Sequence, residues 1–403
     1  MRRFWTDREG NIALVFALAA VPIFGAMGVA IDYSMASAYR ADIQKSLDAT
    51  ALALTKIMPT DQATLDTVGN QFFQANLKSH NLSNLQLTIQ PDVGRLRLSA
   101  SGTYNVQMAN IIGAGTVDLS ASAEAKWSIG KVEIALALDN SWSMNSLGRM
   151  TQLKAASHNL LNVLESAAKQ PDDAKVAIVP FDAVVNVGTA NSAAEWLRWG
   201  VCAGSKCGPA DATNWQGCVW DRDKNDDADD TAPTTENATK YPAWQCGNTI
   251  NSNRLVSSMP LTTDWPSLHA KIDEMIPAGY TNVTIGLVWA WHALSPTPVM
   301  TEGVPYGTEN LTKFVILLTD GDNTRNRFSD STNTMNTRTG LACSNIKAAG
   351  VKIYAVRLIS GNASLLQACA TDPSMYYDVQ NASDLSGVFS AIGSEIASLH
   401  LSK

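Results

Sequence analysis

The segment KVEIALALDNSWSM, residues 131–144, decides the fold that we expect for most of this chain. Its residues 132–138 are apolar apart from Glu133, which is typical of a strand buried on both faces of a mainly parallel sheet. Three oxygen-bearing side chains follow at alternate positions: Asp139, Ser141 and Ser143. Ligands of open α/β sheets bind outside the carboxyl ends of the strands, and a carboxylate with two hydroxyls suits a hard cation. The alternative is an ordinary polar turn that closes the strand.

A second apolar run, KFVILLTD, spans residues 313–320 and also ends in an acid, Asp320. Between the two runs, the glycine-containing loop 279–282 opens a helical pattern with Thr281 at its mouth. Further patterns alternate between strand and helix, which predicts a doubly wound, mainly parallel α/β sheet. We expect strands at 175–181, 184–188 and 352–358, and helices at 151–169, 267–276, 283–294, 341–349 and 385–401.

These residues, in this order, resemble the von Willebrand factor type A (VWA) family over roughly residues 131–400. The resemblance implies a Rossmann-like sheet with a metal-ion-dependent adhesion site built from a DxSxS motif, a loop threonine and a later aspartate. It assigns as metal ligands Asp139, Ser141, Ser143, Thr281 and Asp320. The family more often has glycine where this chain has Tyr280, so Thr284 is the alternative to Thr281. The resemblance further implies bound Mg2+, or Ca2+ or Mn2+, whose open position a partner's Asp or Glu carboxylate fills.

An enzymatic alternative starts from Asp320, Asp322 and Thr324, which match the DxDxT motif of haloacid-dehalogenase-like phosphatases. In such enzymes the first aspartate is the nucleophile and the second an acid/base. The motif stands late in this chain, and the clustered second acidic pair of that family is missing after it. We therefore expect a binding module rather than an enzyme.

Residues 196–265 do not fit the minimal VWA pattern and predict an insertion on the rim of the sheet. They contain six of the eleven tryptophans and four of the six cysteines, and most of these tryptophans are expected in a local core. Local pairing would join Cys202 to Cys207 and Cys218 to Cys246, although sequence alone leaves the other two pairings open. Cys343 and Cys369 would form a third disulfide, which would suit an oxidising compartment.

An acidic run, DRDKNDDADD, spans residues 221–230 of this insertion. Oxygen side chains alternate in it as the early ligands of a Ca2+ loop do, at Asp221, Asp223, Asn225 and Asp227. The glycine and the glutamate that an EF-hand requires are absent, since Asp226 and Ala232 stand there. A looser second Ca2+ site is one interpretation, and a solvated acidic loop is the other.

The N-terminus predicts a membrane anchor. Residues 12–31 carry no charge, and as a helix they would span about 30 Å, the thickness of a bilayer core. Arg2, Arg3 and Arg8 precede this run, so the positive-inside rule predicts a cytoplasmic tail and an outward C-terminal part. A cleaved signal peptide is the alternative. The pattern continues as a helix through residues 32–56.

The same region resembles the TadG-like proteins of bacterial Flp/Tad pilus assembly. The resemblance rests on Gly10, Pro22 within the apolar helix, Asp32, and the segment 47–52. It implies a single-pass inner-membrane protein whose VWA-like domain is periplasmic or surface-facing, with pilus-assembly components as possible partners. The glutamate that related minor pilins carry after a processing glycine is missing after Gly10, which favours permanent anchoring.

Residues 57–130 complete the domain plan, with alternating apolar residues from 85 to 128 that predict a small β-rich spacer. The expected domains are thus 1–56, 57–130 and 131–403. Net charge is −7 with scattered basic residues, so nucleic acid is not an expected partner. The expected function is outward-facing, metal-dependent protein binding in Flp/Tad pilus assembly or surface adhesion. A membrane scaffold with a non-functional metal site is the alternative.

Overall fold

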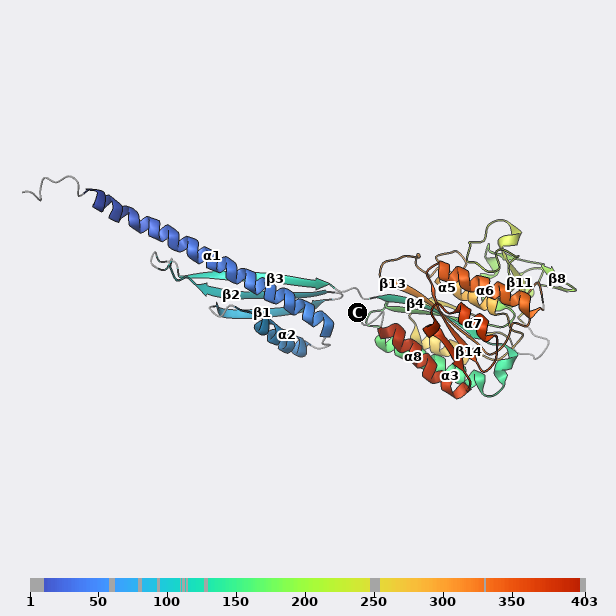
Figure 1. The fold of residues 1–403 in the computed structure, drawn as a ribbon. Coiled ribbons are helices and arrows are strands. Elements are labelled where there is room, and N and C mark those ends of the chain that lie inside the picture. The colour runs from blue at the N-terminus through green and yellow to red at the C-terminus, as the bar shows by residue number, and fades with distance from the viewer. Residues whose placement is uncertain are drawn as a thin grey trace, which may run out of the picture. The chain divides into compact units, whose positions relative to one another are not determined.

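The structure, a computed structural model, describes residues 11–57, 62–78, 82–92, 95–108, 110, 113, 115–126, 130–246, 254–329 and 331–398. It divides the chain into two compact units, residues 1–128 (unit 1) and 129–403 (unit 2) (Figure 1). The predicted cytoplasmic tail and the end of the predicted helix 385–401 lie outside the described residues.

Unit 1 combines two helices with a three-stranded antiparallel sheet in the order β1-β2-β3. Its elements are α1 (Asn11–Ile57), α2 (Gln62–Asn76), β1 (Leu82–Asp92), β2 (Arg95–Asn105) and β3 (Thr116–Lys126). The continuous helix expected from residue 12 to residue 56 is confirmed by α1, whereas α2 was not predicted.

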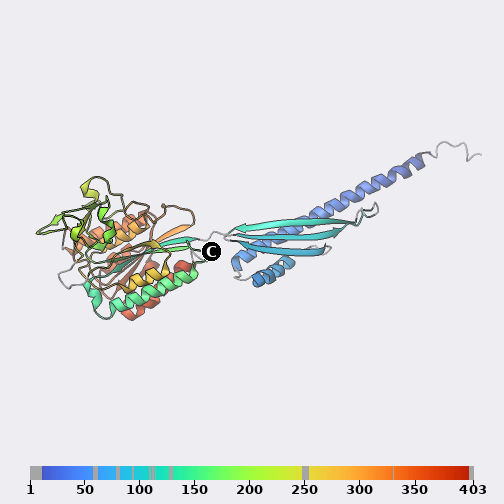
Figure 2. The same ribbon diagram turned by 180° about the vertical axis from the view of Figure 1, so that it is seen from behind.

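The second half of α1 belongs to the β module, which corrects the predicted boundary between residues 56 and 57. Ile43, Leu47 and Leu54 are at most 1% exposed and pack with Phe73 of α2 and the sheet. The helix lies along the sheet in Figure 2. Spacings of four and seven residues place these side chains on one face, so a helix that sequence alone extends from the membrane also contributes to this core.

The first half of α1 presents large apolar side chains that are exposed, among them Leu14, Phe16, Phe24 and Ile31. Among the described residues, α1 is the helix that is long and apolar enough to cross a membrane. At the end of the apolar run, Asp32 is buried and accepts hydrogen bonds from the Tyr104 hydroxyl (3.0 Å) and the Met108 backbone N–H (2.9 Å). The apolar run therefore ends where the packed part of unit 1 begins.

Unit 2 has the predicted doubly wound α/β fold with a mainly parallel central region. Its ten-stranded sheet has the order β15-β14-β13-β4-β5-β6-β10-β11-β7, with β12 also paired to β5. The strands are β4 (Lys131–Asp139), β5 (Ala174–Phe181), β6 (Val185–Asn186), β7 (Leu197–Arg198), β10 (Cys218–Val219), β11 (Tyr241–Trp244), β12 (Met259–Thr262), β13 (Leu311–Thr319), β14 (Lys352–Leu358) and β15 (Tyr376–Val379). The five strands from β15 to β5, at one end of this order, are parallel.

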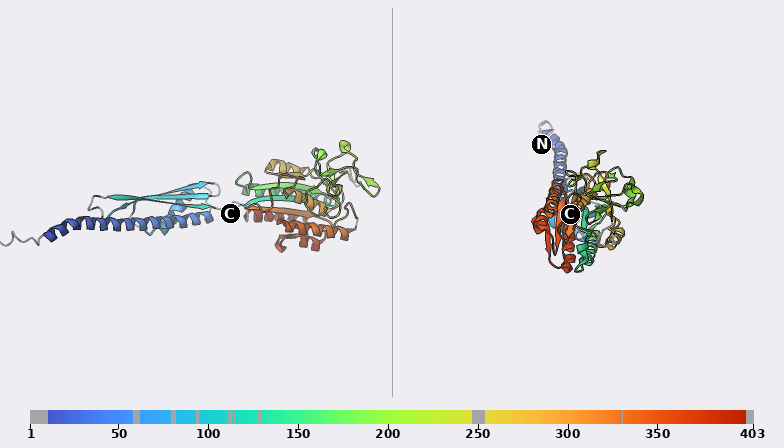
Figure 3. Two further views of the ribbon diagram at one scale, coloured as in Figure 1. Left: turned by 90° about the horizontal axis from the view of Figure 1, so that it is seen from above. Right: turned by 90° about the vertical axis from the view of Figure 1, so that its right-hand side faces the viewer.

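Helices cover both faces of this sheet (Figure 3). One face packs against α3 (Arg149–Ala167), α4 (Trp265–Asp273) and α8 (Leu385–Ile396), and the other against α5 (Val283–Leu294), α6 (Thr332–Ala348) and α7 (Ala363–Cys369). Every residue of α5 is buried. The buried strand β4 lies between β13 and β5, so the apolar run of residues 132–138 forms the centre of the molecule's larger core.

Beyond β6, the insertion extends the main sheet through β10, β11 and β7. It also carries a separate hairpin of β8 (Cys202–Ala203) and β9 (Lys206–Cys207). The structure contains all three locally predicted disulfides: Cys202–Cys207, Cys218–Cys246 and Cys343–Cys369. Trp196, Trp215 and Trp220 are buried as expected, but they share one core with β4 and α5 rather than forming a separate local core.

Candidate metal centre

The candidate centre lies at the carboxyl edge of the central parallel strands. Leu138 of β4 is paired with Leu318 of β13, so Asp139 at the end of β4 and Asp320 directly after β13 emerge at the same edge. Both carboxylates are fully buried. Parallel pairing thus brings together two acids that are 181 positions apart in the numbering.

The serines of the DxSxS motif connect these two aspartates. The Asp139 carboxylate accepts hydrogen bonds from the Ser141 backbone N–H (2.8 Å) and from the Thr319 hydroxyl (2.6 Å). The hydroxyl oxygens of Ser141 and Ser143 are 2.9 Å apart, and the Ser143 hydroxyl donates to Asp320 at 2.5 Å. Four of the five predicted ligands therefore form one hydrogen-bonded cluster.

The fifth predicted ligand, Thr281, lies beside this cluster. A Cβ atom placed on Gly321 would be 3.8 Å from the Ser143 hydroxyl oxygen and 3.9 Å from that of Thr281. Two hydrogen bonds fix the loop, because Thr281 N–H donates to the Thr324 hydroxyl (2.8 Å) and Thr324 N–H donates to the Thr281 carbonyl (2.9 Å). The alternative, Thr284, is buried in α5, where its hydroxyl is 2.8 Å from that of Thr339.

The two carboxylates differ in their electrostatic environment. Burial, together with the nearby charge of Asp320, raises the pKa of Asp139 to about 7. Asp320 has a direct counter-charge, since Arg149 Nη1 at the start of α3 lies 2.6 Å from its Oδ2. The Arg149 side chain is only 10% exposed. Neither Arg149 nor the Thr319 hydrogen bond was predicted, because the motif contains only ligand positions.

The side chains fit a hard divalent cation by their chemistry. Two carboxylates and three hydroxyls are all oxygen donors, as Mg2+, Ca2+ and Mn2+ prefer. Within the described ranges, no group of three or more His, Cys, Asp or Glu side chains could hold a metal ion. Any ion at this edge would therefore need the serine and threonine hydroxyls as ligands. It would also replace Arg149 as the positive charge beside Asp320.

The residues of the proposed second Ca2+ site do not converge. Asp221 accepts from the Asn282 side chain (3.0 Å) and from Arg327 N–H (3.0 Å). Asp223 pairs with Arg198 and Arg327, while Asp227 pairs with Arg338. Asn225 donates its backbone N–H to Asp227. Protein donors already occupy these three carboxylates, and we do not propose a calcium ion there.

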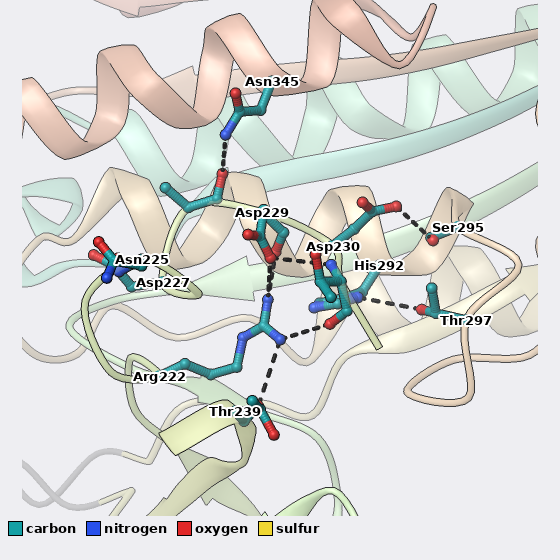
Figure 4. A network of polar contacts seen from close by, with 12 residues as sticks. Arg222, Asn225, Asp227, Asp229, Asp230, Thr239, His292, Ser295, Thr297 and Asn345 are labelled. Carbon is teal, nitrogen blue, oxygen red and sulfur yellow. Dashed lines mark hydrogen bonds and ion pairs between the residues drawn. The ribbon is translucent and has the colours of Figure 1, made fainter. Parts of the chain in front are cut away.

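Hydrogen bonds of the acidic run instead connect the insertion to helices α5 and α6 (Figure 4). Arg222 is fully buried and pairs with Asp229 at 2.9 Å. Asp230 accepts from the Ser295 hydroxyl (2.7 Å) at the end of α5, and Asn345 of α6 donates to the Ala228 carbonyl (3.0 Å). The interpretation as a solvated acidic loop is also incomplete, because each of these contacts involves a buried residue: Arg222, Ser295 or Ala228.

Several solved structures are similar to this chain. The pilus adhesin SpaC from Lactobacillus rhamnosus GG has 13% sequence identity and a TM-score of 0.42, over 78% of this chain and 34% of SpaC. The chain thus spans about a third of the length of SpaC. The vWF domain of the type V pili tip protein Mfa5 from Porphyromonas gingivalis has 12% identity and a TM-score of 0.40, over 66% of this chain and 95% of that domain.

Proximal thread matrix protein 1 from the mussel byssus, with a zinc-occupied MIDAS motif, has 15% identity and a TM-score of 0.37, over 66% of this chain and 47% of that protein. No curated protein sequence matches the chain. At the N-terminus, residues 10–54 match the family model described as "Putative Flp pilus-assembly TadE/G-like", which confirms the resemblance that Gly10, Pro22 and Asp32 predicted for this segment.

Proposed function

We propose that this chain is a membrane-anchored module that binds a divalent cation and, through it, a carboxylate of a protein partner. Mg2+ is the first candidate, with Ca2+ or Mn2+ as alternatives. The observation that carries this proposal is the convergence of Asp139, Ser141, Ser143 and Asp320, with Thr281 beside them, at the carboxyl edge of the sheet. The N-terminal family match supports a setting in Flp/Tad pilus assembly or surface adhesion.

The chain's residues have distinct roles in this proposal. Asp139 and Asp320 would supply the two negative charges, and Ser141, Ser143 and Thr281 would supply neutral oxygens. Because so few charges surround the ion, it would remain electrophilic and attract an Asp or Glu carboxylate. Thr319 is a positioning residue, since its hydroxyl holds Asp139 Oδ2 at 2.6 Å.

The anchoring part of the proposal rests on α1. Its exposed apolar half would cross the bacterial inner membrane once, and the positively charged residues before it would keep the N-terminus cytoplasmic. Unit 2 would then face the periplasm or the cell surface, where its three disulfides are stable.

Calorimetric titration of Mg2+, Mn2+ and Ca2+ into the full-length chain in detergent tests this function. We expect one ion to bind the wild-type chain, and Asp139→Asn to lose that binding. Asp211→Asn is a matched control, because Asp211 is an exposed aspartate of unit 2. Equal binding by Asp139→Asn and wild type would refute the site, and absence of binding to the wild type would favour the membrane scaffold.

A further inference from the structure

A cavity of about 410 Å3 lies next to the candidate centre in unit 2. Tyr280, which precedes Thr281 in the chain, lines it, and so does Arg325, whose backbone N–H donates to the Thr281 carbonyl at 3.2 Å. The cavity and the candidate metal ligand therefore share one loop.

The cavity is formed jointly by the VWA-like core and the insertion. The core contributes Asp182 after β5, with Tyr280 and Arg325, and the insertion contributes Lys206, Trp220 and Trp244. The two disulfides of the insertion include Cys207 and Cys246, which also line the cavity. The insertion wall is thus cross-linked, which lowers the entropy lost when a ligand binds.

The loop that contains Tyr280 can approach Asp182 closely because residue 279 is glycine. Gly279 has a φ angle of +75°, and a Cβ atom there would lie 2.0 Å from Asp182 Oδ2. Burial raises the pKa of the Asp182 carboxyl well above its usual range, which disfavours its charged form.

Two cations remain available in the cavity. Neither Lys206 nor Arg325 forms a salt bridge with an acidic side chain in the described parts of the chain. Arg325 lies over the Tyr280 ring, 5.1 Å from its centroid, which leaves its guanidinium N–H groups for a ligand. Trp244 and Tyr280 offer apolar surface beside these charges.

We propose that this cavity binds a second acidic group of the same partner segment whose first carboxylate would reach the metal. The partner is then a peptide with two nearby acidic residues, one for the metal and one for Lys206 and Arg325. This inference rests on the proposed function and specifies its partner. The two subsites lie at neighbouring positions of one loop, Tyr280 in the cavity and Thr281 at the metal. Residues of an extended peptide advance by about 3.3 Å each, so the two acidic residues of the partner should be a few positions apart.

Peptides test the inference in the full-length chain in detergent, with Mg2+ at saturation. The probes are acetylated, amidated peptides with Asp and Glu separated by up to about three glycines, each matched to a peptide with Gln in place of Glu. We expect the best diacidic peptide to bind about tenfold more tightly than its Gln counterpart, because it gains a charge-assisted hydrogen bond. Arg325→Gln and Lys206→Gln should each reduce this preference.

Controls separate this inference from the proposed function. Arg254→Gln removes an exposed arginine outside the cavity and should keep the full preference. Both cavity variants should bind Mg2+ like the wild type. Failure of the wild type to bind any of Mg2+, Ca2+ and Mn2+ would overturn the proposed function and this inference together. Normal Mg2+ binding with no preference for any diacidic peptide would overturn the inference alone. The same holds if the sugar carboxylate glucuronate binds the wild type, Arg325→Gln abolishes that binding, and no diacidic peptide is preferred.

Discussion

Unit 2 holds two groups of aspartates that look alike in sequence and differ in structure. Hydroxyl groups of two serines connect Asp139 to Asp320, and Arg149 forms an ion pair with Asp320. In residues 221–230, by contrast, Asp223 and Asp227 are each paired with arginine, and Asp230 is bonded to hydroxyls of the core. A candidate metal centre is therefore recognised by oxygen atoms that converge on one point, and not by the number of acids. Acids that pair separately with arginines or hydroxyls connect segments of the fold instead.

The largest expected difference between the two groups concerns stability. Asp227→Asn should lower the free energy of unfolding by about 3 kcal/mol, because it leaves Arg338, whose side chain is 18% exposed, without its buried partner. Asp139→Asn should cause no such loss, since it removes a buried charge that has no direct cation. Tryptophan fluorescence during urea unfolding, which reports mainly on unit 2, measures both variants. Equal losses of unfolding free energy in Asp227→Asn and Asp139→Asn would show that the two groups of aspartates do not differ in their contribution to stability.

Of the two groups of aspartates, only the one with Asp139 and Asp320 should make the metal affinity depend on pH. The pKa of Asp139, raised to about 7, means that the metal-free fold holds a proton there below neutral pH. Binding must release this proton, so Mg2+ affinity should rise about tenfold per pH unit from pH 5 to 7 and then level off. Without metal, the same raised pKa makes the fold lose stability as pH rises from about 4 through 7.

Calorimetry in buffers of different ionisation enthalpy measures this proton release. Asp227→Asn is the matched variant, and it should show the wild-type pH profile. An affinity that is constant between pH 5 and 7 would contradict the assignment of Asp139 as a ligand.

Arg149 makes the comparison sharper, because in the part of the chain that the structure describes it is the arginine that pairs with Asp320. Arg149→Gln should raise Mg2+ affinity about tenfold, since the ion no longer competes with a cation 2.6 Å from Asp320. Arg198→Gln, which removes a partner of Asp223, should leave Mg2+ affinity unchanged. A weaker affinity in Arg149→Gln would instead show that Arg149 positions Asp320 for the ion.

The smallest expected effect distinguishes two threonines. Thr281→Val should reduce Mg2+ affinity a few-fold, because one neutral oxygen is lost from the centre. Thr284→Val should leave affinity unchanged and cost about 1 kcal/mol of stability, since its hydroxyl bond to Thr339 is buried. The reverse pattern in calorimetry and urea unfolding would make Thr284 the ligand.

Sequence predicted best those elements whose pattern is set by burial alone. The strand of residues 132–138 and the helix of residues 283–294 have the expected positions, because both are almost entirely apolar and enclosed by the fold. The predicted helix at 341–349 was too short, since α6 begins at Thr332. Its polar first half is helical in the tertiary structure, where Met335 and Thr339 are buried.

Long-range pairing explains what sequence could not supply. The arginine that pairs with Asp227 is Arg338, 111 positions away, and no spacing rule connects them. The same holds for Arg149 and Asp320, and for the Thr319 hydroxyl on Asp139. Motifs identify the groups that could bind an ion, but only the fold determines which counter-charges they meet.

Anomalous diffraction from crystals of the full-length chain grown with Mn2+ tests the central claim most directly. We predict one manganese peak within coordination distance of Asp139, Ser141, Ser143 or Asp320, and none within residues 221–230. A peak on the acidic run, or well-ordered crystals without a peak at the edge of the sheet, would contradict the account.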